Sequence, residues 1–195
     1  MTTQRLVLSV LSAALLLTSL AAPARAQSCV GFEPPLALGT IYGAPVPQAP
    51  GTVIFTTNGI PVRIYRFQLM NLGWIFNRAS IDLAPVPFSP NQSLRSNNIN
   101  LLFDFSRLAF KPKKVTLSYL DLGGYENLSV NGSSPYHVGE LTAAPAVLGG
   151  VNVSVTSTPV PPPMSGKYGT LTLSGSVTSL LIGGQELWID QVCAQ

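Results

Sequence analysis

The amino-acid sequence predicts an all-β protein whose strands form two stacked antiparallel sheets. Runs of alternating apolar and polar residues recur about every 8 to 15 residues, with turn residues between them. Beyond the N-terminal segment, no run shows the 3.6-residue period of an amphipathic helix. The 17 glycines and 17 prolines lie mostly in the turns. Many short strands with short connections are typical of a β-sandwich or a β-barrel.

Residues 1–26 have the three parts of a cleavable secretory signal peptide. Arg5 supplies the positive n-region, residues 6–22 are apolar, and residues 24–26 (Ala-Arg-Ala) form an A-x-A cleavage site. The apolar run of 17 residues is shorter than the roughly 20 that a membrane-spanning helix needs, although a retained membrane anchor is the alternative. We expect residues 27–195 to form one secreted domain, extracellular or periplasmic, without a membrane span.

The strand-like runs can be placed in order along the mature chain. Residues 52–57 and 61–69 flank Asn58-Gly59, a dipeptide typical of two-residue hairpin turns. Alternation along the second run predicts two faces, one with Val62, Ile64 and the stem of Arg66, the other with Arg63, Tyr65 and Phe67. Further runs cover residues 100–105, 115–121, 151–156, 168–173, 177–182 and 186–192. Eight residues of these runs are expected between the sheets: Leu101, Phe103, Val115, Leu117, Val153, Val155, Leu171 and Leu173.

The two cysteines stand at the two ends of the mature chain. Cys29 is its third residue and Cys193 is the third from its C-terminus. An even number of cysteines in a secreted chain predicts a disulfide, with two free thiols as the alternative. The bridge would bring the first and last strands side by side, with Cα atoms about 4.4–6.8 Å apart.

The charge of the mature chain is close to neutral. Without Arg5 and Arg25 it keeps nine Lys and Arg against eight Asp and Glu, a net charge of +1. Its one basic cluster, residues 111–114, is short enough to be a solvated turn between strands. The composition therefore argues against a nucleic-acid partner.

The two ends of the chain carry the most informative motifs. Residues 29–33 read Cys-Val-Gly-Phe-Glu and are followed by a Gly-rich turn at residues 38–43, while residues 183–193 read Gly-Gly-Gln-Glu-Leu-Trp-Ile-Asp-Gln-Val-Cys. These ends, together with the strand rhythm, resemble the jelly-roll β-sandwiches of extracellular carbohydrate-binding modules and galactose-binding-like domains. The resemblance implies a jelly roll whose opening and closing strands are neighbours.

The resemblance also implies a structural calcium ion held by Glu33, Asp190 and backbone carbonyls. Calcium takes six to eight oxygen ligands, and Glu186 or Asp104 could supply a further carboxylate. Two carboxylates on neighbouring strands would repel each other unless a cation or a proton lay between them. The alternative is that Glu33 and Asp190 are ordinary carboxylates at strand edges.

A second candidate site lies in the middle of the chain. Gly123-Gly124 and Asn131-Gly132 are both turn dipeptides. Between them we expect Tyr125, Glu126 and Asn127 to project from a short loop. An aromatic ring beside an amide and a carboxylate suits sugar recognition, because the ring stacks on the sugar and the polar groups bind its hydroxyls. The alternative is that these residues are ordinary parts of a hairpin.

The sequence contains no recognisable catalytic constellation. His137 is the only histidine, and no Gly-x-Ser-x-Gly motif occurs. A zinc site needs several His or Cys ligands, and with the cysteines paired only His137 would be left to serve as one. We therefore expect no enzyme activity, with a jelly-roll lyase or hydrolase acting through paired carboxylates as the remaining catalytic alternative.

We therefore expect a secreted, calcium-stabilised binding module whose partner is an extracellular glycan or another matrix component. The alternative is a structural or adhesive protein of the cell envelope or matrix without a small ligand. Strand faces rich in Ser, Thr and Asn favour that alternative. Two or three rings on one concave face, such as Tyr65, Trp74 or Tyr125, would favour the binding module.

Overall fold

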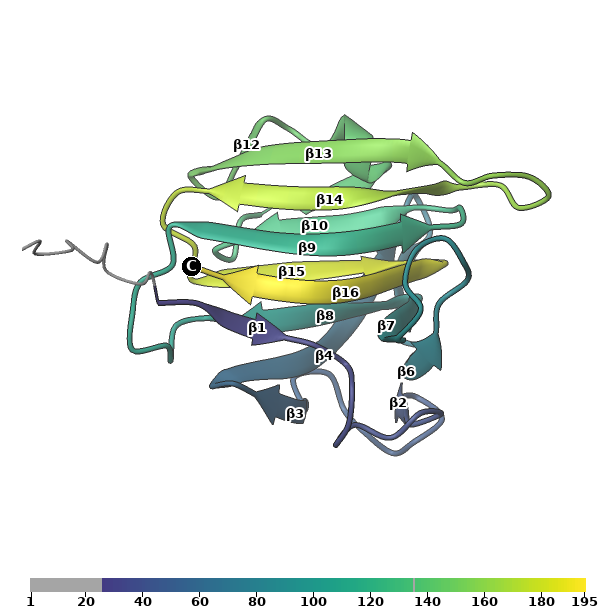
Figure 1. Ribbon diagram of the computed structural model, residues 1–195, viewed down its shortest axis with the longest axis horizontal. Coiled ribbons are helices and arrows are strands. Elements are labelled where there is room, and N and C mark those ends of the chain that lie inside the picture. The colour runs from purple at the N-terminus through teal and green to yellow at the C-terminus, as the bar shows by residue number, and fades with distance from the viewer. Residues whose placement is uncertain (1–25, 135) are drawn as a thin grey trace, which may run out of the picture.

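The computed structural model describes residues 26–134 and 136–195, so the predicted signal peptide lies, except for Ala26, outside the described residues. The described chain forms two antiparallel sheets that pack face to face (Figure 1). Its described helical structure is a single short 3-10 helix, η1 (Leu141–Ala143), and none of it is long and apolar enough to cross a membrane. The predicted all-β sandwich of two antiparallel sheets is confirmed.

The chain crosses repeatedly from one sheet to the other. Sheet A runs, in spatial order, through β12 (Val147–Leu148), β13 (Val151–Pro159), β14 (Lys167–Ser174), β9 (Lys114–Asp121), β16 (Leu187–Ala194), β7 (Gln92–Asn97), β6 (Arg78–Leu83) and β2 (Ile41–Gly43), with β1 (Ser28–Val30) also paired to β16. Sheet B runs through β11 (His137–Gly139), β10 (Glu126–Val130), β15 (Ser179–Gly184), β8 (Ile99–Asp104), β4 (Ile60–Leu69) and β3 (Val53–Thr57), with β5 (Gly73–Ile75) paired to β4.

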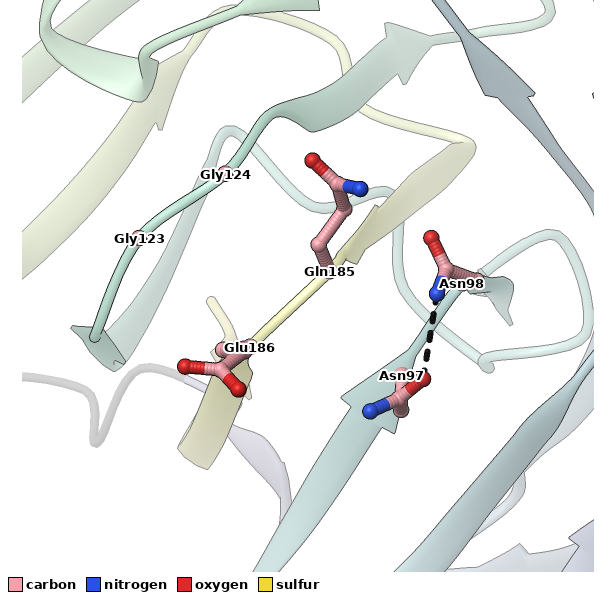
Figure 2. Close-up of a pocket in the computed structure, with 6 residues that line it drawn as sticks. All are labelled: Asn97, Asn98, Gly123, Gly124, Gln185 and Glu186. Atoms are coloured by element: carbon pink, nitrogen blue, oxygen red, sulfur yellow. Dashed lines mark hydrogen bonds between the residues drawn. The ribbon is translucent and has the colours of Figure 1, made fainter.

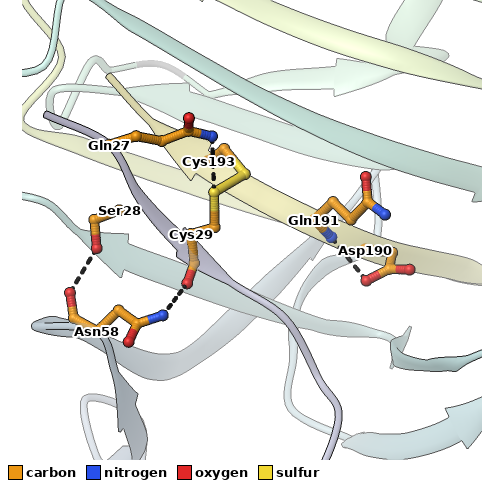
Figure 3. The surroundings of a disulfide bond; sticks show 7 residues. All are labelled: Gln27, Ser28, Cys29, Asn58, Asp190, Gln191 and Cys193. Atoms are coloured by element: carbon orange, nitrogen blue, oxygen red, sulfur yellow. Dashed lines mark hydrogen bonds between the residues drawn. A yellow bond between two sulfur atoms is a disulfide. The ribbon is translucent and has the colours of Figure 1, made fainter. Parts of the chain in front are cut away.

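The first and last strands are neighbours, as predicted. Strand β1 pairs antiparallel with β16, and Cys29 lies opposite Cys193. The two cysteines form a disulfide with Cα atoms 4.0 Å apart, a little closer than the expected range (Figure 3). Asn58 adds a second tie, because it accepts a hydrogen bond from Ser28 Oγ (2.6 Å) and donates one to the Cys29 carbonyl (2.8 Å). Since Asn58 lies in the β3–β4 turn, β1 links sheet A to sheet B.

The core lies between the two sheets and is built from every second residue of the strands. Six of the eight predicted core residues are at most 1% exposed: Leu101, Phe103, Val115, Leu117, Leu171 and Leu173. Val153 and Val155 are partly buried and pack against this core, because β13 lies close to the edge of sheet A.

Strand β4 alternates buried and partly buried residues in its first half only. The hairpin at Asn58-Gly59 is confirmed, and both turn residues have positive φ (49° and 78°). Beyond Tyr65 burial no longer follows the two predicted faces, because Arg66 is exposed and Phe67 is fully buried. There β4 leaves β8, pairs with β5, and curls over the outer side of sheet B.

Strand β16 is covered on both faces. Leu187 and Ile189 point into the core. Trp188 lies on the outer face of sheet A in a second apolar cluster with Ala84, Leu120 and Val160, and the Arg95 guanidinium lies 4.6 Å from the centroid of its ring. Asp190 shares this outer face but is only 8% exposed, because the segment between β6 and β7 covers it.

Candidate binding site

An aromatic pair with one exposed ring lies beside a hollow on the outer side of sheet B. Trp74 on β5 is 52% exposed and meets Tyr136 edge-to-face, with ring centroids 5.7 Å apart and an interplanar angle of 84°. The hollow, called the aromatic hollow below, has a volume of about 460 Å³ and is lined by Gln68, Trp74, Gly132, Ser133, Ser134 and Tyr136. This volume lies in the usual range of small-molecule sites.

Of the three rings named from the sequence, only Trp74 lines this hollow. Tyr65 is partly buried on β4. Burial raises the pKa of Tyr136, and the nearby Tyr65 hydroxyl raises it further, so these two rings are close. Tyr125 is 39% exposed but lies elsewhere, just before β10. Tyr136 was not predictable from the sequence, because it follows a Ser-Ser-Pro segment with no strand pattern.

Two buried asparagines fix the backbone that frames the hollow. Asn127 Oδ1 accepts a hydrogen bond from the Gln68 amide (2.7 Å), and Asn127 Nδ2 donates one to the Gln68 carbonyl (2.9 Å). Asn100 Nδ2 donates to Asn127 Oδ1 (3.1 Å) and to the Arg66 carbonyl (2.7 Å). Since Gln68 is paired with Trp74 in the β4–β5 ladder, this network positions two residues of the hollow.

A glycine lets this network cross sheet B. Gly183 on β15 is paired with Asn127 on one side and with Asn100 on the other. A Cβ at Gly183 would overlap the Ile99 carbonyl oxygen and the Asn100 side chain, and would lie 2.8 Å from Asn100 Cα. The two amide side chains therefore meet over a position where only glycine fits.

The predicted loop of Tyr125, Glu126 and Asn127 is wrong for two of its three residues. Glu126 and Asn127 are the first residues of β10, and both are completely buried. The sequence suggested a hairpin, but the connection at residues 122–125 crosses from β9 in sheet A to β10 in sheet B, so its far end enters the interior. This connection is called the arch below. A ligand contact by the exposed Tyr125 stays a prediction.

The two ends of the arch carry carboxyl groups that face each other between the sheets. Asp121 ends β9 on the face of Tyr119, and Glu126 begins β10 on the face of Leu128. Asp121 is 4% exposed and Glu126 is 0% exposed. Burial, with the charges of Asp121 and Glu140, raises the pKa of Glu126 to about 9. Burial also raises the pKa of Asp121, which the Gly123 amide opposes.

A polar pocket opens beside Gly123 and Gly124 of the arch (Figure 2). It has a volume of about 420 Å³ and is called the arch pocket below. The Tyr125 amide donates to Gln185 Oε1 (3.0 Å), which ties the arch to the β15–β16 turn. The pocket is lined by Gly123 and Gly124 of the arch, by Gln185 and Glu186 of that turn, and by Asn97 and Asn98 at the end of β7.

Glu33 and Asp190 lie near each other at the outer side of sheet A. Asp190 accepts hydrogen bonds from Ser89 Oγ (3.1 Å) and from the Gln191 amide (2.8 Å, Figure 3), and Glu33 accepts one from the Gln92 amide (3.0 Å). Burial raises the pKa of Asp190, and the charge of Glu33 raises it further. No group of three His, Cys, Asp or Glu side chains suited to a metal occurs among the described residues, so neither Glu186 nor Asp104 completes such a group here.

Comparison with protein-family models, curated proteins and solved structures gave no match. The resemblance of the chain ends to carbohydrate-binding modules and galactose-binding-like domains therefore stays a prediction. Among the features described above, the aromatic hollow is the one that combines an exposed ring with several uncharged hydrogen-bonding groups.

Proposed function

We propose that this protein is a secreted, non-catalytic binding module that recognises an extracellular glycan at the aromatic hollow. The exposed ring of Trp74 is the observation that carries the proposal. A large aromatic side chain that is 52% exposed leaves much apolar surface in water. Tyr136 holds this ring from one side, and the hollow beside it supplies the polar contacts that a purely apolar partner would not need.

The lining of the hollow suits a neutral, hydroxyl-rich ligand. The indole of Trp74 offers an apolar surface on which the C–H face of a sugar ring stacks. The amide of Gln68 and the hydroxyl of Ser134 can each donate and accept hydrogen bonds, while the Ser133 hydroxyl already accepts one from the Val130 amide. No lining residue is charged, which favours a neutral glycan over an acidic one.

Hydrogen bonds hold the backbone of the aromatic hollow in place, and this lowers the entropy cost of ligand binding. Asn127 holds both backbone groups of Gln68 at hydrogen-bond distance, and Gln68 is in turn paired with Trp74. A lining that is already ordered loses less conformational entropy when the ligand binds. This arrangement supports a preformed site.

A glycan array tests the proposal on the purified mature domain. The test variant is Trp74→Ala, and the matched control is Leu72→Ala, which removes a 79% exposed apolar side chain next to the same β5 strand but outside the lining of the hollow. We expect the wild-type protein and the Leu72 variant to bind the same glycans. The Trp74 variant should bind them at least about tenfold more weakly. Equal binding by the Trp74 variant, or an array without any bound glycan, would contradict the proposal.

The edge of sheet A supports a second candidate, a self-associating structural or adhesive protein. Strand β12 pairs only with Val151 and Asn152 of β13, and β13 then runs along the edge of the described sheet with exposed Ser154 and Thr156. An open strand edge is a template for pairing with another chain. Light scattering should then show concentration-dependent oligomers that Ser154→Lys abolishes. A monomer at every concentration would exclude this route of association.

We also propose that calcium stabilises the two ends of the chain through Glu33 and Asp190. Burial raises the pKa of Asp190 and the charge of Glu33 adds to it, and a cation bound between the two carboxylates would relieve their repulsion. Both are carboxylates, and the Ser89 hydroxyl beside Asp190 is a further oxygen, which is the donor type that calcium prefers.

A further inference from the structure

The arch carries the chain from one sheet to the other, and a buried carboxyl group stands at each end of it. We propose that Asp121 and Glu126 form a pH-dependent latch: one shared proton keeps the arch closed, and loss of that proton opens the arch and remodels the arch pocket. This inference concerns the interior of the sandwich and does not depend on glycan binding at the aromatic hollow.

The first support is the way in which the two groups are buried. Glu126 is completely buried, and neither of its carboxyl oxygens has a hydrogen-bond partner at good geometry among the described residues, although the nearby Leu141 amide opposes the rise in its pKa. Two ionised carboxylates in a low-dielectric interior would repel each other strongly. A single proton between Asp121 and Glu126 removes this repulsion and gives Glu126 a hydrogen-bond partner.

One basic group among the described residues lies near the pair: Lys167 is opposite Asp121 in the β9–β14 ladder and opposes the rise in the pKa of Asp121, but Glu140 engages it. Tyr119 lies next to Asp121 on the same inner face, but its hydroxyl donates to the Thr156 carbonyl (3.0 Å). Glu140 adds negative charge near Glu126. Lys167 is engaged by Glu140 at 2.7 Å in an ion pair that solvent reaches, since the two side chains are 42% and 47% exposed, and such a pair is screened.

Among the described residues, the other strands that flank Glu126 present glycines to it and no charged group. Gly184 on β15 is paired with Glu126, and a Cβ at Gly184 would lie 3.5 Å from Glu126 Oε1 and 2.6 Å from the Leu187 Cβ of β16. Gly139 on β11 is the partner of Glu126 on its other side. A shared proton is therefore what reduces the negative charge of Asp121 and Glu126.

The latch acts on the arch pocket through short connections. Asp121 Oδ1 accepts a hydrogen bond from the Gly123 amide (2.8 Å), and Gly123 and Gly124 both line the pocket. Only residues 122–125 lie between the two carboxyl groups. A separation of the two ends must therefore move the glycines that form one wall of the pocket.

The direction of the pH dependence follows from the raised pKa of Glu126. An unfolded chain releases this proton near pH 4.5, whereas the folded chain holds it up to about pH 9. The unfolded state thus binds fewer protons than the folded state in that window. Stability is full below about pH 4.5 and falls as the pH rises toward 9.

Thermal melting between pH 5 and pH 9.5 tests the latch in the mature domain. The variant is Glu126→Gln, which keeps the shape of the side chain and removes its titration. The control is Glu186→Gln, the same change at an exposed position of the arch pocket. The melting temperature of the wild type and of the control should fall by about 5–10 °C over this range, and that of the Glu126 variant should fall by clearly less.

A second measurement uses only the wild-type protein, in case the variant does not fold. The NMR amide signals of Gly123 and Gly124 should shift with a common midpoint above pH 7, far above the ordinary range of a glutamate. Midpoints below pH 5, or a wild-type melting temperature that does not fall toward alkaline pH, would overturn the proposal. Equal pH slopes in the wild type and the Glu126 variant would overturn it as well.

Discussion

Replacement of Asn127 by alanine should destabilise the whole domain, although the residue lies on the side of sheet B that faces away from the core. Asn127 alternates with Glu126 and Leu128, so its side chain points outward. It is nevertheless completely buried, because β4 curls over it. The truncation removes the carboxamide that joins β10 to Gln68 and to Asn100.

The magnitude can be worked from the lost hydrogen bonds. Asn127 takes part in three, at 2.7 and 2.9 Å to the Gln68 backbone and at 3.1 Å to Asn100. Each contributes about 1 kcal/mol net, and a buried group left without a partner costs about 1–3 kcal/mol. Asn100 keeps its bond to the Arg66 carbonyl, so the main loss falls on Gln68. We expect a loss of about 3–4 kcal/mol, a large share of the usual 5–15 kcal/mol stability of a domain.

Urea denaturation of the mature domain, followed by tryptophan fluorescence, measures this loss. The matched control is Asn152→Ala on β13, because Asn152 is exposed and exposed substitutions usually change stability by less than about 0.5 kcal/mol. The midpoint of the Asn127 variant should fall well below those of the wild type and of the control. A difference from the wild type of less than about 1 kcal/mol would refute the assignment of Asn127 as a structural link.

Two further predictions concern the ends of the chain. The Cys29→Ala, Cys193→Ala double variant removes the disulfide, which closes a loop of 164 residues. The chain-entropy model gives a decrease in the free energy of unfolding on the order of 5 kcal/mol as an upper figure. An unchanged denaturation midpoint would contradict this prediction. Excess chelator should lower the melting temperature of the wild type and leave a Glu33→Gln variant almost unaffected, and equal melting temperatures of the wild type with calcium and with chelator would leave the calcium site without support.

The parts of the fold that follow from period-2 patterns were predictable from the sequence. Val115 and Leu117 alternate with polar neighbours, and one face of such a strand must be buried. Asn58-Gly59 predicted its hairpin because both residues adopt positive φ readily. The pairing of β1 with β16 followed from the positions of Cys29 and Cys193, which a disulfide holds together whatever the rest of the chain does.

The interior of the candidate site was not predictable, because local pattern does not show which sheet a strand joins. Glu126 and Asn127 follow two glycines and look like a hairpin turn, yet the strands before and after them lie in different sheets. The burial of Phe67 was not predictable either, because β4 changes partner after Arg66. Such a change depends on contacts with distant residues such as Asn127.

Strand β10 places the two proposed devices at adjacent positions on opposite faces. Glu126 points into the interior and shares its proton with Asp121, while Asn127 points outward and holds Gln68 of the aromatic hollow. Adjacent residues of a strand move together, since they share one peptide unit. A displacement of Glu126 on loss of the proton must therefore reach Gln68 through Asn127. By this route, glycan affinity at the aromatic hollow should fall as the pH rises and the arch opens. In the Glu126→Gln variant, this fall at alkaline pH should be absent.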